Sequence, residues 1–469
     1  MERRSGAKGN AEQPHMRRTQ SRESMSQRLS RVREAAKQRK KERFTALFHL
    51  LTAEALENAF LSLSRKAAAG VDGVRWKDYA ENLKVNIADL HRRLHQGSYR
   101  AQPGRRHYIP KADGKQRPLG IASLEDKIVQ YALVKILNAV YENDFMGFSY
   151  GFRPGRSQHN ALDALATGLV RTNVNWVLDA DISQFFDKVS HEWLIRFIEH
   201  RIGDQRVIRL IRKWLTAGTS EEGKWRASEE GTPQGAVISP LLANIYLHYV
   251  FDLWAHQWRR RHATGNVVMV RYADDIVIGF DKRIDAQCFR IAMQRRLKEF
   301  GLTVHPKKTR LMEFGRFAAE NRASRGKGKP ETFNFLGFTH ISGKDRSGRF
   351  MLIRKTRRDR MTATLKAIKD GLRKRWHYSI PEQGKWLRRV VQGYLNYHSV
   401  PGNYPMMRKF RIYVTDLWRR ALRRRSQQDD TTWTKANRLA AVWLPKVRVL
   451  HPWPVERFTA RHPRQEPGA

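Results

Sequence analysis

The chain is short of cysteine and of long apolar segments. Its 469 residues include one cysteine, Cys288, which excludes an intramolecular disulfide and any cysteine-rich zinc module. It has no run of about 18 apolar residues of the kind that spans a membrane, and its basic N-terminus is not followed by the apolar segment of a signal peptide. These absences predict a protein of the reducing cytoplasm with no membrane partner.

Acidic residues are also scarce relative to basic ones. The chain has 45 Asp and Glu against 90 Lys and Arg, which gives a formal net charge of +45. A charge of this size favours a polyanionic partner, and nucleic acid is the simplest one. The hydrophobic fraction of 41% is sufficient for packed cores. At this length we expect about three domains.

The N-terminal part divides into a tail and a helical segment. Residues 1–43 are basic, rich in Ser and Gln and poor in apolar residues, which predicts a flexible tail that either adds affinity for RNA or only solvates the chain. In the segment 44–107, apolar residues recur at helical spacing over 44–63 and 79–97. Gly97 is expected to end the second helix.

Residues 108–345 alternate between strands and helices. Residues 105–121 predict a hairpin, and 175–187 predict a buried strand that ends in acidic residues. Residues 124–142 and 240–258 predict apolar helices. This alternation is typical of an α+β domain, in which we expect the helices to pack on one face of the sheet.

Residues 346–425 predict a helical bundle with a basic surface. Three helices each carry an apolar stripe. Between residues 354 and 425 the only acidic residues are Asp359, Asp370, Glu382 and Asp416. A packed bundle of this charge would repel itself without a partner, so nucleic-acid binding is favoured over a merely solvated basic face. The basic segment 426–469 predicts either a DNA-binding module or a clasp that packs onto the bundle.

The stretch "RYADDIVIG", residues 271–279, interrupts an apolar run with two adjacent aspartates. Strands are expected over 267–272 and 276–280, with Asp274 and Asp275 between them. Two neighbouring carboxylates in a buried turn repel each other and lose hydration unless cations compensate. The alternative is an ordinary turn that faces solvent, and this stretch alone favours neither interpretation.

A metal site would require a third acidic ligand, which the strand "WVLDADI" offers. Asp181 is the best candidate, but Asp179 shares its strand face and Asp187 lies nearby, so alternation alone does not choose between them. Such carboxylates would bridge two magnesium ions roughly 4 Å apart, a pair that activates a 3′-hydroxyl and stabilises a leaving pyrophosphate.

Seven motifs occur in the order of the conserved blocks of reverse transcriptases. They are "RPLGIASLEDKIVQ", "SYGFRPGRS", "DISQFFD", "GTPQGAVISPLLANIYL", "YADD", "GLTVHPKKT" and "FNFLGFTH". These versions resemble those of group II intron maturase reverse transcriptases, and the bundle with "GYLNYHSVPGNY" is similar to the thumb or maturase domain of that family. The resemblance implies a right-hand polymerase fold. Residues 44–107 would extend the fingers, 108–345 would form fingers and palm, and 346–425 would form the thumb.

The resemblance implies an RNA-directed DNA polymerase that binds its own intron RNA, assists its splicing and copies it into cDNA during intron mobility. Its partners would be group II intron RNA, target DNA, a primer-template and deoxynucleoside triphosphates, and its cofactor would be two Mg²⁺ ions. Two alternatives are that the chain is an RNA-binding splicing factor without polymerase activity, or that it is a reverse transcriptase of a retron or defence system. The intact "YADD" with Asp181 argues against the first, and the basic bundle argues against the second.

The resemblance also implies roles for acidic and aromatic residues. The catalytic, metal-binding carboxylates would be Asp181, Asp274 and Asp275, which sets Asp179 aside. Phe186 matches the aromatic residue that excludes a ribose 2′-hydroxyl and so selects deoxynucleotides. The adjacent Phe185 is an alternative for this role.

Basic and polar residues would contact the substrates. Lys111 and Arg117 match residues that grip the incoming triphosphate, and Lys308 matches a lysine near the same phosphates. Gln234 matches the residue that contacts the nucleotide or the template. Two further arginines would either touch the nucleic-acid backbone or form ion pairs within the domain: Arg153 and Arg156.

Overall fold

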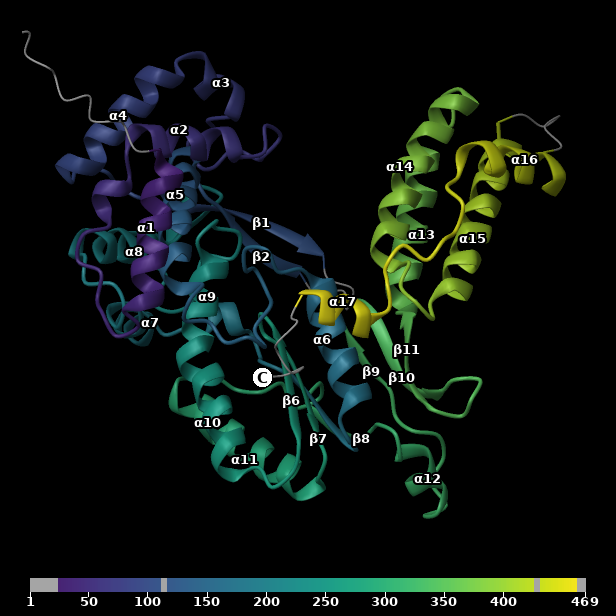
Figure 1. The fold of residues 1–469 in the computed structure, drawn as a ribbon. Helices are drawn as coiled ribbons and strands as arrows, with labels where there is room; N and C mark the ends of the chain where they lie inside the picture. Colours follow the sequence, from purple (N-terminus) through teal and green to yellow (C-terminus); the bar gives the residue numbers. More distant parts are fainter. Residues whose placement is uncertain (1–23, 111–115, 426–430, 462–469) are drawn as a thin grey trace, which may run out of the picture.

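A computed structural model describes residues 24–110, 116–425 and 431–461 of the chain (Figure 1). Figure 1 shows the N-terminal helices on one side of the molecule and a helical bundle on the other, with β-sheets between them. Within these described residues, no helix combines the length and the apolar character needed to cross a membrane. Lys111, a predicted triphosphate ligand, lies outside the described residues, as does the tail segment 1–23.

The N-terminal region is helical over most of its described length. Its helices are α1 (Met25–Gln38), η1 (Phe48–Leu50), α2 (Ala53–Ser62), α3 (Trp76–Glu81) and α4 (Leu83–Gln96). The helix expected over 44–63 is broken before Thr52, whose side chain caps α2. Gly97 ends α4 in the left-handed conformation, with φ of 81°, as its position predicted.

The next region joins a small sheet to a long buried helix. Its strands, in the order β2-β1-β4-β5, are β1 (Gly104–Pro110), β2 (Gln116–Ile121), β4 (Thr219–Glu221) and β5 (Lys224–Arg226). Its helices are α5 (Leu124–Tyr141), α7 (His191–Glu199) and α8 (Gln205–Thr216). β1 and β2 form the predicted hairpin, and α5 confirms the helix expected over 124–142.

The prediction of a flexible tail is wrong for its described part, residues 24–43. Ser24 and Gln27 form a capping box that begins α1, and α1 packs against α5. The buried Arg201 then fixes the end of this segment by donating from Nη1 to the carbonyl oxygen of Glu42 at 2.6 Å. A helix with so narrow an apolar stripe depends on these tertiary contacts, so composition alone did not reveal it.

The central sheet has the strand order β6-β7-β3-β8. Its strands are β3 (Trp176–Asp181), β6 (Val267–Tyr272), β7 (Asp275–Phe280) and β8 (Arg310–Glu313). The surrounding helices are α6 (Gln158–Arg171), α9 (Ser239–Leu247), α10 (Leu253–His262) and α11 (Arg283–Glu299), with a π-helical turn, η3 (His248–Asp252), between α9 and α10. The helix expected over 240–258 therefore forms, with this turn inside it.

Both faces of the central sheet are covered. α6 packs against β6 and β7, and α11 packs against β3 and β7. Alternate strand residues enter two different cores, with Leu178 and Ile278 in one and Val177 and Val277 in the other. The mixed helix and sheet architecture is confirmed. The expectation of helices on one face only is wrong, because period-2 alternation does not reveal what covers the second face.

The C-terminal part contains a third sheet and the helical bundle. The sheet consists of β9 (Phe333–Phe335), β10 (Phe338–Lys344) and β11 (Phe350–Thr356), and α12 (Ala318–Ala323) precedes it. The bundle consists of α13 (Arg358–Arg373), α14 (Ile380–His398), α15 (Tyr404–Arg423) and α16 (Trp433–Trp443). The three predicted helices form here and enclose a separate core that includes the buried Trp418.

The chain returns from the bundle to the central region. α17 (Pro454–Arg461) packs on α6, and Arg457 forms an ion pair with Asp163 of that helix (Figure 1). On the way, the amide of Leu450 donates to the carbonyl oxygen of Ser399 at 3.0 Å. Within the described residues 431–461, this packing favours a clasp over a separate DNA-binding module, and the clasp extends beyond the bundle to α6.

Candidate active site

The hairpin β6–β7 presents the two adjacent aspartates at its turn. The strands pair as far as Tyr272 and Asp275, so the turn consists of Ala273 and Asp274. Ala273 has φ of 56°, because a two-residue hairpin turn requires positive φ. The apolar arms on both sides are buried, as their composition predicted.

Strand β3 brings a third carboxylate to this turn. β3 pairs antiparallel with β7, and Asp181 lies directly opposite Asp275. Opposite residues share a face of the sheet, so Tyr272, Asp275 and Asp181 form a row across β6, β7 and β3. In the neighbouring row on the same face, β6 and β7 contribute the buried Val270 and Val277, and β3 contributes Asp179. On β6 and β7 the carboxylates therefore lie where the apolar part of this face ends.

The carboxylates perturb one another. Loss of hydration, reinforced by the charge of Asp181, raises the pKa of Asp274. Loss of hydration and the charge of Asp274 raise the pKa of Asp275 to about 7, although Asp275 as a whole residue is exposed. Burial raises the pKa of Asp179 to about 7, an effect that Arg310 opposes. A cluster of carboxylates with raised pKa values favours binding of a cation, which would relieve the repulsion between their negative charges.

Two basic side chains, those of Lys308 and Arg117, lie near these carboxylates. Nζ of Lys308 donates to Oδ2 of Asp181 at 2.8 Å, and this bond raises the pKa of Lys308. The loop that carries Lys308 is held to the end of β3, since the amide of His305 donates to the carbonyl oxygen of Asp181 at 2.7 Å. Arg117, exposed on β2, partly offsets the raised pKa of Asp274. The structure thus brings together five of the predicted residues: Asp181, Asp274, Asp275, Arg117 and Lys308.

The donor chemistry of the three aspartates suits a hard divalent ion, which prefers carboxylate oxygens. In the described part of the chain, however, no group of three or more Asp, Glu, His or Cys side chains is arranged to hold a metal ion. At Asp181 the ammonium of Lys308 supplies the neutralising charge instead. A metal ion at this position would therefore compete with Lys308 for the same carboxylate oxygen.

Phe185 and Phe186 follow β3 in the short turn η2 (Phe185–Asp187), and burial distinguishes them. Phe185 is 1% exposed and belongs to the core, whereas Phe186 is half-buried. The amide of Thr232 donates to the carbonyl oxygen of Phe186 at 2.7 Å, which holds the "GTPQG" loop beside it. In that loop, Nε2 of Gln234 donates to Oδ1 of Asp187 at 2.6 Å. Of the two rings, Phe186 is the one accessible to a ligand.

The two arginines of "FRPGRS" have partners inside the protein. Arg153 is 5% exposed, forms an ion pair with Glu142 at 3.1 Å and donates to the carbonyl oxygen of Ser149 at 2.8 Å. Arg156 donates to the same carbonyl oxygen at 3.2 Å and lies over the ring of Tyr150. For both residues the structure favours the internal pairing over a contact with the nucleic-acid backbone.

A buried arginine that the motifs did not single out supports the aspartate turn. Arg271, in β6, is 0% exposed and forms an ion pair with Asp252, with N–O distances of 2.6 and 2.7 Å. Its Nη1 also donates to the carbonyl oxygen of Ala273 at 2.9 Å, and its Nη2 to Oγ of Ser149 at 2.7 Å. Its signal in the sequence is a charge inside an apolar strand, directly before "YADD".

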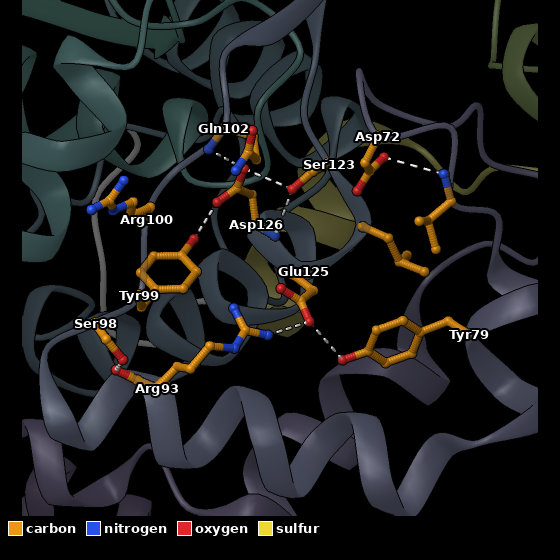
Figure 2. Close-up of a pocket in the computed structure, with 12 residues that line it drawn as sticks. Asp72, Tyr79, Arg93, Ser98, Tyr99, Arg100, Gln102, Ser123, Glu125 and Asp126 are labelled. Atoms are coloured by element: carbon orange, nitrogen blue, oxygen red, sulfur yellow. Dashed lines mark hydrogen bonds and ion pairs between the residues drawn. The ribbon is translucent and has the colours of Figure 1, made fainter.

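A separate cavity of about 470 Å³ lies between α4 and the start of α5 (Figure 2). Figure 2 shows Glu125 between Arg93 and Tyr79, from which it accepts hydrogen bonds at 2.7 and 3.4 Å. Beside them, the buried Asp126 accepts a hydrogen bond from Tyr99. These groups are hydrogen-bond partners of one another, and Asp181, Asp274 and Asp275 do not line the cavity. We interpret these hydrogen bonds as structural: they join the N-terminal helices to α5 around the cavity.

Comparison with known proteins identifies relatives of this chain. Residues 109–340 match the family described as "Reverse transcriptase (RNA-dependent DNA polymerase)". Protein YkfC of Escherichia coli is 43% identical over 206 residues, which cover 43% of this chain and 54% of that protein. Group II intron-encoded protein LtrA of Lactococcus lactis is 37% identical over 223 residues, which cover 47% of this chain and 37% of that protein.

A longer match is the putative COX1/OXI3 intron 1 protein of Saccharomyces cerevisiae. It is 26% identical over 393 residues, which cover 69% of this chain and 46% of that protein. The chain thus spans about half, or less, of the length of these relatives. The resemblance to group II intron-encoded proteins that the motifs predicted is confirmed.

Proposed function

Residues 109–340 belong to the reverse transcriptase family, and from this premise we propose that the chain is an RNA-directed DNA polymerase encoded by a group II intron. The observation that carries the proposal is the pairing of Asp181 with Asp275, next to Asp274, where the apolar face of the central sheet ends. Nucleotidyl transfer requires metal-binding carboxylates beside fixed positive charges for the phosphates. Arg117 and Lys308 would supply those charges.

Asp181, Asp274 and Asp275 would hold two divalent ions, for which Mg²⁺ is suited because all the donors are carboxylate oxygens. When bound, such ions supply activation of the primer 3′-hydroxyl and charge that stabilises the departing pyrophosphate. The role of the chain is to keep three mutually repelling carboxylates close together, through the hairpin turn and the β3–β7 register. Lys308 would leave Asp181 to contact the triphosphate.

The incoming deoxynucleotide would lie between these carboxylates and the small sheet. Arg117 on β2 would bind its triphosphate together with Lys308, and Phe186 would contact its sugar where a 2′-hydroxyl would clash. The accessibility of Phe186, compared with the buried Phe185, supports this assignment. Gln234 would contact the nucleotide or the template from the adjacent loop. Lys111 would also bind the triphosphate, a role that rests on the family resemblance.

We propose that residues 346–425 act as thumb and as the maturase surface that binds intron RNA, with residues 44–107 as an extension of the fingers. A groove between α13 and α15 supports this role, because it is lined by the basic side chains Lys369, Arg373, Arg420 and Arg424. Residues 426–469 would clasp the bundle and contribute positive charge toward target DNA. We also propose a cytoplasmic location, which the single cysteine fits because disulfides are rare in the reducing cytoplasm.

Primer extension tests the polymerase proposal. With Mg²⁺, the wild type should extend a DNA primer on an RNA template, and the double substitution Asp274→Ala and Asp275→Ala should abolish extension. Asp179→Asn is the matched control, because Asp179 lies on the same face of β3 but outside the ligand set, and it should retain most of the activity. An inert wild type or an active double variant would refute the polymerase, and equal loss in Asp179→Asn would refute the choice of ligands.

A splicing assay tests the maturase proposal. The protein should restore splicing of the group II intron RNA that surrounds its gene at Mg²⁺ concentrations too low for the RNA alone. Polymerase activity without any rescue of splicing would restrict the proposal to the polymerase.

A further inference from the structure

Phe152, in the motif "SYGFRPGRS", combines two unfavourable properties. Its side chain is 52% exposed, and its backbone has φ of 59°, in the left-handed region that a bulky residue adopts only at an energetic cost. An exposed ring on a strained backbone persists only where the surroundings impose it, and such residues concentrate at functional sites.

The surroundings do impose this conformation. The amide of Tyr150 donates to the carbonyl oxygen of Arg271 at 2.9 Å, which adds the segment before Phe152 to the outer edge of β6. A Cβ atom on Gly151 would clash with the backbone of Ala273, so only glycine allows the segment to approach the aspartate turn this closely.

The residues on either side of Phe152 are also anchored. Asn244 donates from Nδ2 to the carbonyl oxygen of Gly151 at 2.7 Å. The buried Arg153 is held by Glu142, as described above. The loop is therefore fixed on both sides, and Phe152 is the side chain that remains exposed between the two anchors.

The ring of Phe152 extends the row that contains the carboxylates. Its centroid lies 6.1 Å from that of Tyr272, which is half-buried. Tyr272 is opposite Asp275, and Asp275 is opposite Asp181. The row therefore has two aromatic rings at its β6 end and carboxylates on β7 and β3, with Lys308 at the far end.

We infer that Phe152 and Tyr272 form an aromatic platform that binds the 3′-terminal nucleotide of the primer. The inference rests on the proposed polymerase function, since the strand end that reacts at the aspartates must lie beside them. Lys308 suits the triphosphate at one end of the row, which leaves the apolar end for the primer terminus. Contact with an aromatic face does not depend on base identity, as a primer end of any sequence requires.

The test uses a primer-template whose primer ends in 2-aminopurine, a fluorescent base whose emission falls when it stacks. Phe152→Ala should weaken binding of this duplex about tenfold and remove most of the quenching. Phe152→Trp should retain both the affinity and the quenching. Phe317→Ala removes a phenylalanine that is 42% exposed near α12 and should change neither, which makes it the matched control.

Phe152→Gly separates backbone strain from ring contact. Because glycine adopts φ of 59° without strain, this variant should melt at a higher temperature than Phe152→Ala while binding the primer equally weakly. If Phe152→Ala binds and quenches like the wild type, the inference is refuted even if the enzyme extends primers. If the wild type extends no primer but its quenching depends on Phe152, the polymerase proposal fails and the aromatic platform stands.

Discussion

Asp252→Asn should loosen the turn that carries Asp274 and Asp275. Asp252 and Arg271 are both 0% exposed, and the carboxylate accepts two hydrogen bonds from the guanidinium, at 2.6 and 2.7 Å. Removing one charge of a buried pair leaves the other uncompensated, which costs about 3–5 kcal/mol. Asparagine retains one acceptor oxygen, so we expect the lower end, about 3 kcal/mol. That is a large part of the roughly 5–15 kcal/mol that stabilises an ordinary domain.

The loss of stability in Asp252→Asn should affect the β6–β7 hairpin more than the rest of the protein. Arg271 also donates to the carbonyl oxygen of Ala273 at 2.9 Å, so the variant should lose positional control of the turn. Hydrogen exchange, followed by mass spectrometry, should become faster in β6 and β7. Urea titration should give the lowered free energy of unfolding. In primer extension, kcat should fall more than the KM for the nucleotide rises, because the carboxylates are displaced while the phosphate contacts remain.

A surface pair provides the matched control. Arg196 and Glu192 form an ion pair whose side chains are 57% and 72% exposed, and exposed pairs contribute about 0–1 kcal/mol. Glu192→Gln is the same carboxylate-to-amide change and should cost less than about 1 kcal/mol. If Asp252→Asn were as mild as Glu192→Gln, or if exchange in β6 and β7 were unchanged, the supporting role of the buried pair would be refuted.

Three further predictions concern the bundle, the contact of α17 with α6, and a histidine of α6. In α14, Gly384→Ala should destabilise the bundle by roughly 1–3 kcal/mol, because its Cβ would clash with an indole ring. A Cβ atom on Gly393 would meet open space, so Gly393→Ala should stabilise the bundle by roughly 1 kcal/mol. Equal shifts in melting temperature for the two variants would contradict this packing. Arg457→Met should release α17 from α6 and expose it to proteases, because the buried Asp163 loses a charge partner; unchanged resistance would count against the clasp. Burial lowers the pKa of His159 from 6.5 to about 3, so the unfolded chain binds more protons and stability falls as the pH drops below about 6.5. His159→Phe should flatten the fall in melting temperature between pH 7 and 5, and an unchanged slope would exclude this residue as a source of it.

Elements with local signals were predictable from the sequence. The β1–β2 hairpin, the long helix α5 and the end of α4 at Gly97 follow from apolar periodicity and turn chemistry, which act over a few residues. Helix α1 was missed because its stability comes from α5 and Arg201, both distant in the chain. The covering of both sheet faces was missed for the same reason, since it depends on where α6 and α11 pack.

The candidate site divides in the same way. Asp274 and Asp275 are adjacent in the chain and interrupt an apolar run, so the sequence alone marked them, and the motif order added Asp181, Arg117 and Lys308. Tertiary structure decided the rest. The β3–β7 register sets Asp181 opposite Asp275, and burial distinguishes Phe186 from Phe185.

The motif "SYGFRPGRS" shows why the two sources of information differ. In the sequence its arginines attract attention as ligands for a polyanion, and Phe152 does not. In the fold Arg153 is buried against Glu142, and Phe152 is exposed beside the aspartate turn. Residue type determines which interactions a side chain is able to make. Burial and direction determine which of them it makes, and these arise from contacts between segments far apart in the chain.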